Sequence, residues 1–324
     1  MNDTERSESP ISDQVPRTLQ GGRLAQAADS FFVLRPTLMF PLWTMILAGV
    51  GLSDESKKIS SGEWVALVVS LSALFGLVYL LNQLKDRAGD AINAKLFLIA
   101  SGKFSNRHLM IEIIVLILFG IGGLLLSHQW HVWFWILLGV VIGGVIYNFT
   151  PWALERNPAG GVIAGFVGGW LLIRLGGEIG GGGADFMEEL PYALAFTSAC
   201  LIAGLLDRRG DEVAGKRTFA VVFGEKVTIA VCLAGFLSVI LFGGWNGDWL
   251  IIAPAALSLP VLFYGWWNED VNKAVTANKI AIFILSFGVG FKFIPYLVVI
   301  VLYYPIARWY HRTRFGLRYP SLAE

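Results

Sequence analysis

Long apolar stretches recur along almost the whole chain, and they constrain its fold more than any other feature. Hydrophobic residues make up 55% of the 324 residues and charged residues only 15%, which is far from the composition of ordinary soluble domains. A helix of about 20 apolar residues spans the ~30 Å hydrocarbon core of a bilayer. The stretches of suitable length are residues 31–51, 64–82, 108–127, 131–149, 159–175, 190–206, 226–245, 249–267 and 279–304. We therefore expect an all-α, multi-pass membrane bundle of about nine transmembrane helices.

The two ends of the chain are polar, unlike the body between them. Residues 1–30 mix both charges and lack the apolar segment of a cleaved signal peptide, so they are predicted to be a disordered cytoplasmic leader. Residues 31–310 would then form the transmembrane domain and residues 311–324 a short basic tail. The net charge of +1 comes without a basic stripe, which argues against a nucleic-acid partner.

The distribution of Lys and Arg predicts the topology. These residues gather in the connections after the second and sixth apolar stretches, at Lys85, Arg87, Lys95, Lys103, Arg107, Arg208, Arg209, Lys216 and Arg217. By the positive-inside rule both connections face the cytoplasm. Because four spans separate them, both also emerge on the same face. We expect a multi-pass protein of the cell inner membrane, surrounded by membrane lipid. Its active site is expected to face the cytoplasm.

The last apolar stretch leaves the span count open. An odd count would place the basic tail outside, against the preference of Arg308, Arg312, Arg314 and Arg318 for the cytoplasm. Gly288 and Pro295 could break one long helix, or divide the stretch into two helices that return the tail to the cytoplasm. Nine spans are the favoured interpretation, and ten are the alternative.

Two acidic clusters directly follow the second and sixth apolar stretches. If both stretches are helical, Asn82, Asp86 and Asp90 share one helix face, as do Asp207 and Asp211. Carboxylate and amide oxygens are the ligands that Mg²⁺ prefers. Magnesium ions can bridge carboxylates to a diphosphate and stabilise it as a leaving group.

The spacing Asp-x3-Asp-x4-Lys occurs in both clusters, ending at Lys95 and at Lys216. A solvated cytoplasmic rim would explain one such cluster equally well. Two clusters that continue apolar helices on the same face instead indicate a functional site, because ionisable groups at membrane depth are costly.

These motifs resemble those of the UbiA superfamily of intramembrane prenyltransferases. The first signature of that family is matched by Asn82, Gln83, Asp86 and Asp90, with Asn93 and Lys95 downstream. The second is matched by Asp207, Gly210, Asp211, Gly215, Lys216, Thr218, Val221 and Gly224. Further similarities are the Tyr147-x3-Pro151 element and the Arg35-Pro36 pair. The resemblance covers residues 31–304.

The resemblance implies a ring of helices around a central cavity, capped on the cytoplasmic side by the two acidic motifs. It implies Mg²⁺-dependent transfer of an isoprenyl group from a polyprenyl diphosphate, through an allylic cation, to a hydrophobic acceptor such as an aromatic or lipid-like molecule. The metal-binding and catalytic residues, holding two Mg²⁺ ions, would be Asp86, Asp90, Asp207 and Asp211. The substrate-binding residues would be Asn82, Lys95, Tyr147, Arg156, Lys216 and Arg35.

Two departures from the family pattern accompany this resemblance. Gly204 stands where many members have another Asp, and Leu154-Glu155-Arg156 stands where a Lys is usual. An intramembrane terpene cyclase is the alternative enzyme, and a divalent-cation transporter is the alternative from another class. Acceptor identity and donor chain length stay open.

Several residues inside the apolar stretches have more than one possible role. Cys200 and Cys232 are expected to be buried packing residues. The aromatic residues that could line a cavity, although packing is their commoner role, are Phe75, Tyr79, Tyr147, Trp170 and Tyr192.

Overall fold

The regular structure is helical throughout the residues that the computed structural model describes, which are 22–53, 59–87, 98–99, 104–149, 151–317 and 319–320. The first half of the chain contains α1 (Arg23–Val33), α2 (Pro36–Leu52), α3 (Ser61–Lys85), α5 (Asn106–Ser127), the 3₁₀ turn η3 (Trp130–Val132), α6 (Trp133–Val140), the π-helix η4 (Val141–Ile146) and the 3₁₀ turn η5 (Leu154–Arg156). The second half contains α7 (Pro158–Gly180), α8 (Phe186–Val213), α9 (Phe219–Asn246), α10 (Trp249–Trp267), α11 (Val271–Lys292) and α12 (Ile294–Phe315). The all-α prediction is confirmed.

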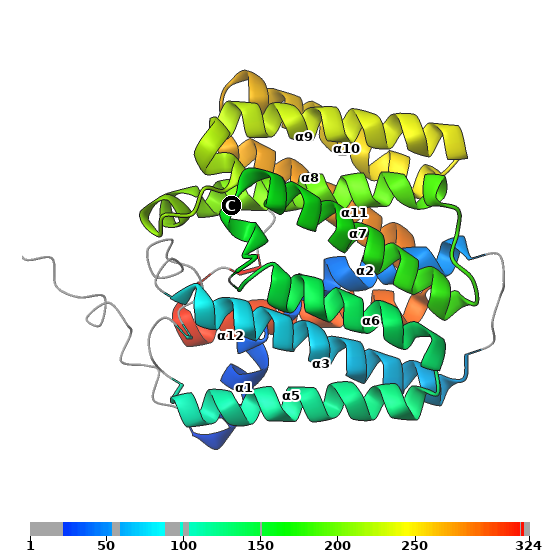
Figure 1. Cartoon of the computed structure of the whole chain (residues 1–324), viewed down its shortest axis with the longest axis vertical. Coiled ribbons are helices and arrows are strands. Elements are labelled where there is room, and N and C mark those ends of the chain that lie inside the picture. Colours follow the sequence, from blue (N-terminus) through cyan, green and yellow to red (C-terminus); the bar gives the residue numbers. More distant parts are fainter. Residues whose placement is uncertain are drawn as a thin grey trace, which may run out of the picture.

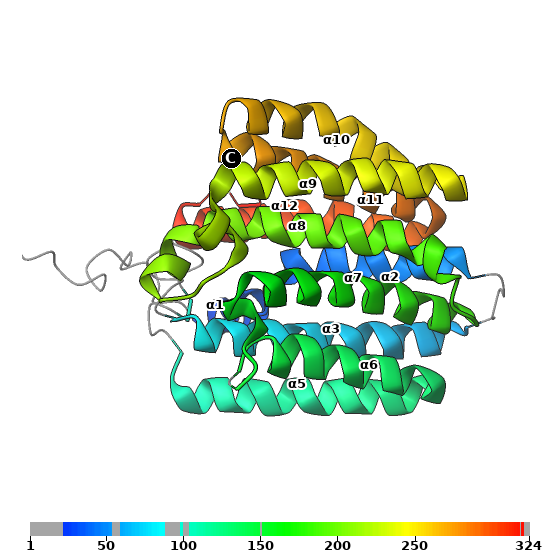
Figure 2. The same cartoon turned by 45° about the horizontal axis from the view of Figure 1, so that its top comes forward.

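The long helices lie side by side in one bundle, with their connections at two opposite ends (Figure 1). Contacts are most extensive between helices that follow one another, such as α3 and α5, α8 and α9, and α10 and α11. Helix α2 packs along α7, and the view in Figure 2 shows the same neighbours. Helices α3 and α8 both terminate on the same side of the bundle, which we call the motif end. The opposite side is called the far end.

Seven described helices are long and apolar enough to cross a bilayer, and eight if the bent pair 24–33 and 36–52 is one span. A shorter apolar helix, Trp130–Ile146, lies beside them. This agrees roughly with the expected count of about nine. The bend of 46° between α1 and α2 lies at Arg35, which adopts a left-handed conformation (φ 54°) directly before Pro36.

The last apolar stretch divides into two helices at Phe293, between α11 and α12. Helix α12 then runs back along α2 and α1. The Tyr303 hydroxyl is hydrogen-bonded to Thr37 (2.8 Å), and the Tyr310 hydroxyl donates to Asp29 (2.6 Å). The basic end of α12 therefore returns to the end of the bundle where α1 begins, as in the two-helix alternative.

The predicted limits of the transmembrane domain differ from the ends of these helices. Helix α1 begins at Arg23, before residue 31, and α12 continues to Phe315, past residue 310. Residues 1–21, the greater part of the expected leader, lie outside the described residues.

Glycines hold α2 and α7 together toward the far end. A Cβ atom added to Gly49 would lie 2.0 Å from the carbonyl oxygen of Ile173, and one added to Gly176 would lie 1.9 Å from that of Ile46. Only glycine permits this backbone contact between helices. The contact fixes α2 beside α7 inside the bundle.

Candidate active site

Lys216 joins the two acidic motifs at the motif end. Its ammonium nitrogen Nζ donates a hydrogen bond to Asp86 Oδ1 (2.7 Å) and lies 3.7 Å from Asp211 Oδ1. Asp86 directly follows α3, and Asp211 lies in the last turn of α8. Carboxylates from two motifs that are distant in the sequence are therefore within reach of one cation.

The end of α8 explains why Lys216 points back toward the acidic residues. Gly215 adopts a left-handed conformation (φ 71°), and its N–H donates to the carbonyl of Glu212 (3.1 Å). The N–H of Lys216 donates to the carbonyl of Asp211 (2.8 Å). This pair of bonds is a Schellman motif, which reverses the chain at the C-terminus of a helix and for which glycine is best suited.

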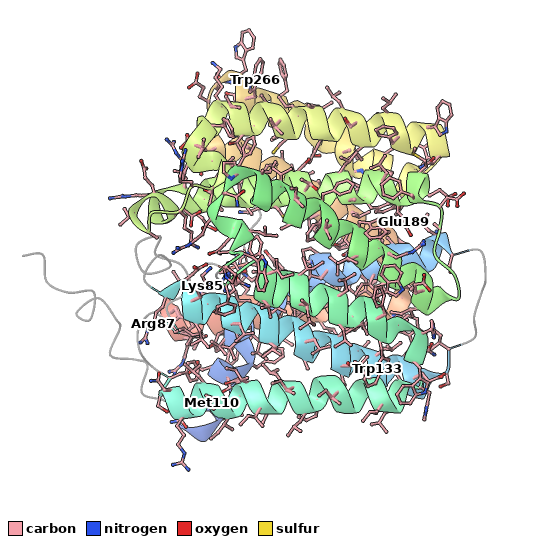
Figure 3. The ribbon with its side chains drawn as sticks, viewed as in Figure 1. Lys85, Arg87, Met110, Trp133, Glu189 and Trp266 are labelled. Carbon is pink, nitrogen blue, oxygen red and sulfur yellow. The ribbon has the colours of Figure 1, made fainter. Side chains whose placement is uncertain are left out.

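Glu155 is a third carboxylate in this cluster. It lies on η5 with a side chain that is only 5% exposed, and its Oε2 is 3.3 Å from Lys216 Nζ. Its other oxygen, Oε1, accepts a hydrogen bond from Lys85 Nζ, at the end of α3. Figure 3 shows Lys85 at the motif end, opposite Glu189 and Trp133 at the far end. Glu155 therefore connects a lysine from each motif. From the sequence, Glu155 is noted only as part of a departure from the family pattern and is not predicted to belong to the site.

Asn148 is a second residue that the sequence did not single out. Its carboxamide is buried, and its Oδ1 accepts a hydrogen bond from Asn82 Nδ2 (2.8 Å). The same Asn82 nitrogen donates to Asp86 Oδ2 (3.3 Å). Its own Nδ2 donates to the carbonyls of Gly143 and Gly144 in η4. Asn148, two residues after the end of the π-helix η4, thus orients the first motif, and π-helices are often found at functional sites.

The other predicted residues are placed as follows. Asp207 lies one turn before Asp211 on α8. Tyr147 follows η4 directly, and its carbonyl accepts the N–H of Glu155 (3.2 Å). Arg35 lies at the bend between α1 and α2, and Arg156 is exposed at the end of η5. Asp90 and Lys95 lie outside the described residues.

An accessible helix face leads from the acidic residues into the bundle. Cys200 and Ala203 precede Asp207 on one face of α8, at intervals of three and four residues. The expectation that Cys200 is buried is wrong: the residue is exposed, and it lies near Tyr79 of α3 and Tyr147. Cys200 and Ala203 are thus accessible positions on the face of α8 that carries Asp207.

Two aromatic residues proposed for the cavity instead stabilise the fold. The indole N–H of Trp170 donates to Glu189 Oε2 (2.7 Å), and the hydroxyl of the fully buried Tyr192 donates to Asp248 Oδ2 (2.7 Å). Cys232 is buried, as expected.

The electrostatics of the cluster favour a bound cation. Burial alone would lower the pKa of Lys216, but the hydrogen bond and charge of Asp86, with the charges of Glu155 and Asp211, outweigh it and raise the pKa. Lys216 is therefore protonated at neutral pH. Within the described residues, no three His, Cys, Asp or Glu side chains are already arranged as a metal centre. The carboxylate oxygens that surround Lys216 are nevertheless of the kind that Mg²⁺ takes.

Comparison with known proteins gives one consistent family. The family model described as the UbiA prenyltransferase family matches residues 37–287. The chloroplastic chlorophyll synthase of Oryza sativa subsp. japonica is 29% identical over 220 residues, which cover 61% of this chain and 56% of that protein. The chain thus matches little more than half the length of that relative. The bacteriochlorophyll synthase 34 kDa chain of Chloroflexus aurantiacus is 26% identical over 314 residues, covering 89% and 96% of the two chains.

Solved structures support the same fold. The structure of a UbiA homolog from Archaeoglobus fulgidus bound to GPP and Mg²⁺ matches with a TM-score of 0.66 at 17% identity, over 80% of this chain and 98% of that one. A digeranylgeranylglyceryl phosphate synthase matches with a TM-score of 0.55 at 13% identity, over 81% and 98%. Because the family model covers most of the chain, the protein belongs to the UbiA prenyltransferase family.

Proposed function

We propose that this protein is a Mg²⁺-dependent membrane prenyltransferase that moves an isoprenyl group from a polyprenyl diphosphate to a lipophilic acceptor. The observation that carries the proposal is the meeting of Asp86 and Asp211 around Lys216 Nζ. Mg²⁺ in phosphate-binding sites is usually held by one or two carboxylates together with the substrate phosphates, and here the two carboxylates come from different motifs with basic groups beside them. Family membership and the names of the relatives, which include a homolog bound to GPP and Mg²⁺, support the same reaction class.

The residues have separate tasks in this proposal. Asp86, Asp207 and Asp211 would hold the metal, two ions in all, together with Asp90 and the carboxamide of Asn82. Bound Mg²⁺ would supply positive charge that stabilises the departing diphosphate. Substrate phosphate would be contacted by Lys216, Lys95, Arg156 and Arg35. Glu155 would keep Lys85 and Lys216 turned toward this site.

The interior below the cluster would protect the allylic cation. Apolar walls exclude water, which would otherwise trap the cation, and aromatic faces stabilise positive charge. Tyr79 and Tyr147 are the candidates for this role, since both lie near the exposed Cys200 of α8. The C1–O bond to diphosphate would break first, and the acceptor would then attack C1 of the allylic cation and lose its proton.

The membrane orientation completes the proposal. The motif end carries Lys85, Arg87, Lys216 and the basic end of α12, so it would face the cytoplasm of a cell with this protein in its inner membrane. Exposed tryptophans at the far end, Trp130, Trp245 and Trp249, would lie at the opposite interface.

The direct test is release of diphosphate from labelled geranylgeranyl diphosphate by the purified protein. Release is expected in Mg²⁺ and is expected to stop in EDTA. Release that continues without metal would contradict the proposal. Analysis of the products with the donor alone separates transfer from cyclisation, because a cyclase makes a hydrocarbon or terpene alcohol without an acceptor.

A further inference from the structure

An apolar cavity lies inside the bundle, away from the acidic cluster. It has a volume of about 620 Å³, counting the space at its open side, and is enclosed by α2, α8, α9, α10 and α11. Two of the described residues that line it are polar, Thr44 and Asn278. The other lining residues are hydrophobic, so the cavity fits a molecule that is mostly hydrocarbon.

Thr44 has its hydrogen bonds within the fold. Its hydroxyl donates to the carbonyl of Phe40 (2.9 Å) and is hydrogen-bonded to the hydroxyls of Ser286 (2.8 Å) and Tyr296 (2.7 Å). It has no remaining capacity that a ligand must satisfy.

Asn278 is different, because its acceptor is unsatisfied. The residue is only 9% exposed, and its Nδ2 donates weakly to the carbonyl of Ala199 across to α8 (3.4 Å). The other atom of the carboxamide, Oδ1, is buried and has no hydrogen-bond partner. Burial of an unpaired carbonyl oxygen is costly. A donor group placed here would relieve that cost.

The position of Asn278 defines the orientation of such a donor. Asn278, Ala281, Ile282 and Leu285 share one face of α11, and Asn278 is the member nearest the motif end. Its partner Ala199 lies eight residues before Asp207, or about 12 Å along α8 at ~1.5 Å per residue. The polar group of a ligand would thus face the acidic cluster, and its hydrocarbon would extend toward Leu285.

We propose that this cavity binds a lipophilic alcohol whose hydroxyl group donates a hydrogen bond to Asn278 Oδ1. A pure hydrocarbon or an ether fills the same volume but leaves the oxygen unpaired. An ammonium group would pay the large desolvation cost of a charge in an apolar cavity. A hydroxyl is a neutral donor and avoids the cost of burying a charge. This binding does not depend on the proposed transferase activity.

Photolabelling of the full-length protein in lipid nanodiscs tests the site. The probe is a C12 fatty alcohol with a diazirine in its chain, and the comparison probe is its methyl ether, which has the same hydrocarbon and no donor. Peptide mass spectrometry locates the adducts. The alcohol is expected to label cavity residues of α10 and α11 roughly five- to tenfold more than the ether. This ratio is the difference in affinity that one hydrogen bond usually gives.

Two variants sharpen the test. Asn278→Leu is expected to reduce labelling by the alcohol to the level of the ether. Asn268→Leu is the matched control, since the Asn268 carboxamide is exposed and donates to the carbonyl of Tyr264 outside the cavity. The Asn268→Leu variant should be labelled by the alcohol as strongly as the wild type. The comparison of the alcohol and ether probes uses the wild-type protein alone, so it still tests the proposal if Asn278→Leu folds poorly. Equal labelling by alcohol and ether, or adducts outside the cavity, would overturn the proposal, whereas diphosphate release tests the transferase separately.

Discussion

At the scale of single residues, one buried cluster of opposite charges connects the two acidic motifs. Lys216 contacts Asp86 and Glu155, and Glu155 also contacts Lys85. Buried ion pairs add little net stability when complete, but removing one partner leaves a charge without compensation. Single substitutions in this cluster should therefore have large effects.

Glu155→Gln is expected to lower both stability and donor binding. It removes the charge that faces Lys85 and Lys216, so the free energy of unfolding should fall by about 3 kcal/mol. Glu225→Gln is the control, because the Glu225–Arg208 pair is more than one third exposed on both sides and should change stability by less than about 1 kcal/mol. Thermal or denaturant unfolding in detergent measures both. Equal effects of the two substitutions would show that Glu155 is not an organising residue.

The coupling of Glu155 to Lys216 can be measured in the same assay. If Glu155 acts mainly by positioning Lys216, then Glu155→Gln should weaken donor binding much less in a Lys216→Met background than in the wild type. Independent, additive losses would contradict this role.

At the scale of elements, helix ends determine where the functional groups point. The reversal of the chain at Gly215 turns Lys216 back over α8, as described above. Gly215→Ala should cost roughly 1–2 kcal/mol, because alanine disfavours the left-handed conformation although nothing lies near the added methyl group. Gly204→Ala, in the interior of the same helix and equally unhindered, should instead stabilise by about 1 kcal/mol. Unfolding measurements that give both changes the same sign would refute the argument.

Helix α12 is held to α1 by a buried carboxylate. Asp29 is fully buried and accepts hydrogen bonds from Tyr310 (2.6 Å) and from two guanidinium nitrogens of Arg314 (3.1 and 2.8 Å). Asp29→Asn should release the end of α12 and speed amide hydrogen exchange in residues 306–315 by tenfold or more, a change of roughly 1.4 kcal/mol. Lys226→Met, which removes the exposed pair with Glu269, should leave exchange in α12 unchanged. Slow exchange in Asp29→Asn would contradict this view of the contact.

The sequence predicts some of these features and not others. Asn82 and Asp86 are four residues apart, so helical geometry alone places them on one face. The same holds for Asp207 and Asp211. By contrast, Glu155 and Asn148 have partners more than 60 residues away, and nothing local predicts such pairs. The course of α12 also depends on distant partners, such as Thr37 for Tyr303.

At the scale of the whole molecule, the fold brings both motifs to one end. Counting spans from the apolar stretches was sufficient to predict this, because an even number of crossings separates the motifs. The cavity around Asn278 could not be predicted, since five helices from both halves of the chain enclose it. Cys200 illustrates the same limit: an apolar stretch predicts burial, whereas the packing of α8 leaves this residue exposed.

The predicted topology can be tested by labelling single cysteines with a membrane-impermeant reagent, after replacing Cys200 and Cys232. Arg217→Cys and Arg312→Cys should react from the same side of the membrane, because α8 and α12 both end at the motif end. Gly182→Cys, between α7 and α8, should react from the other side. Labelling of positions 217 and 312 from opposite sides would exclude this arrangement.

The central claim is that both acidic motifs hold one magnesium diphosphate. Calorimetric binding of geranyl thiolodiphosphate, which does not ionise readily, tests it in wild-type protein and in the Asp86→Asn and Asp211→Asn variants. Binding is expected to require Mg²⁺ and to weaken roughly tenfold or more in each variant, since each removes a contact to a charged complex. Binding that persists without metal, or that one of the two variants leaves intact, would contradict the account.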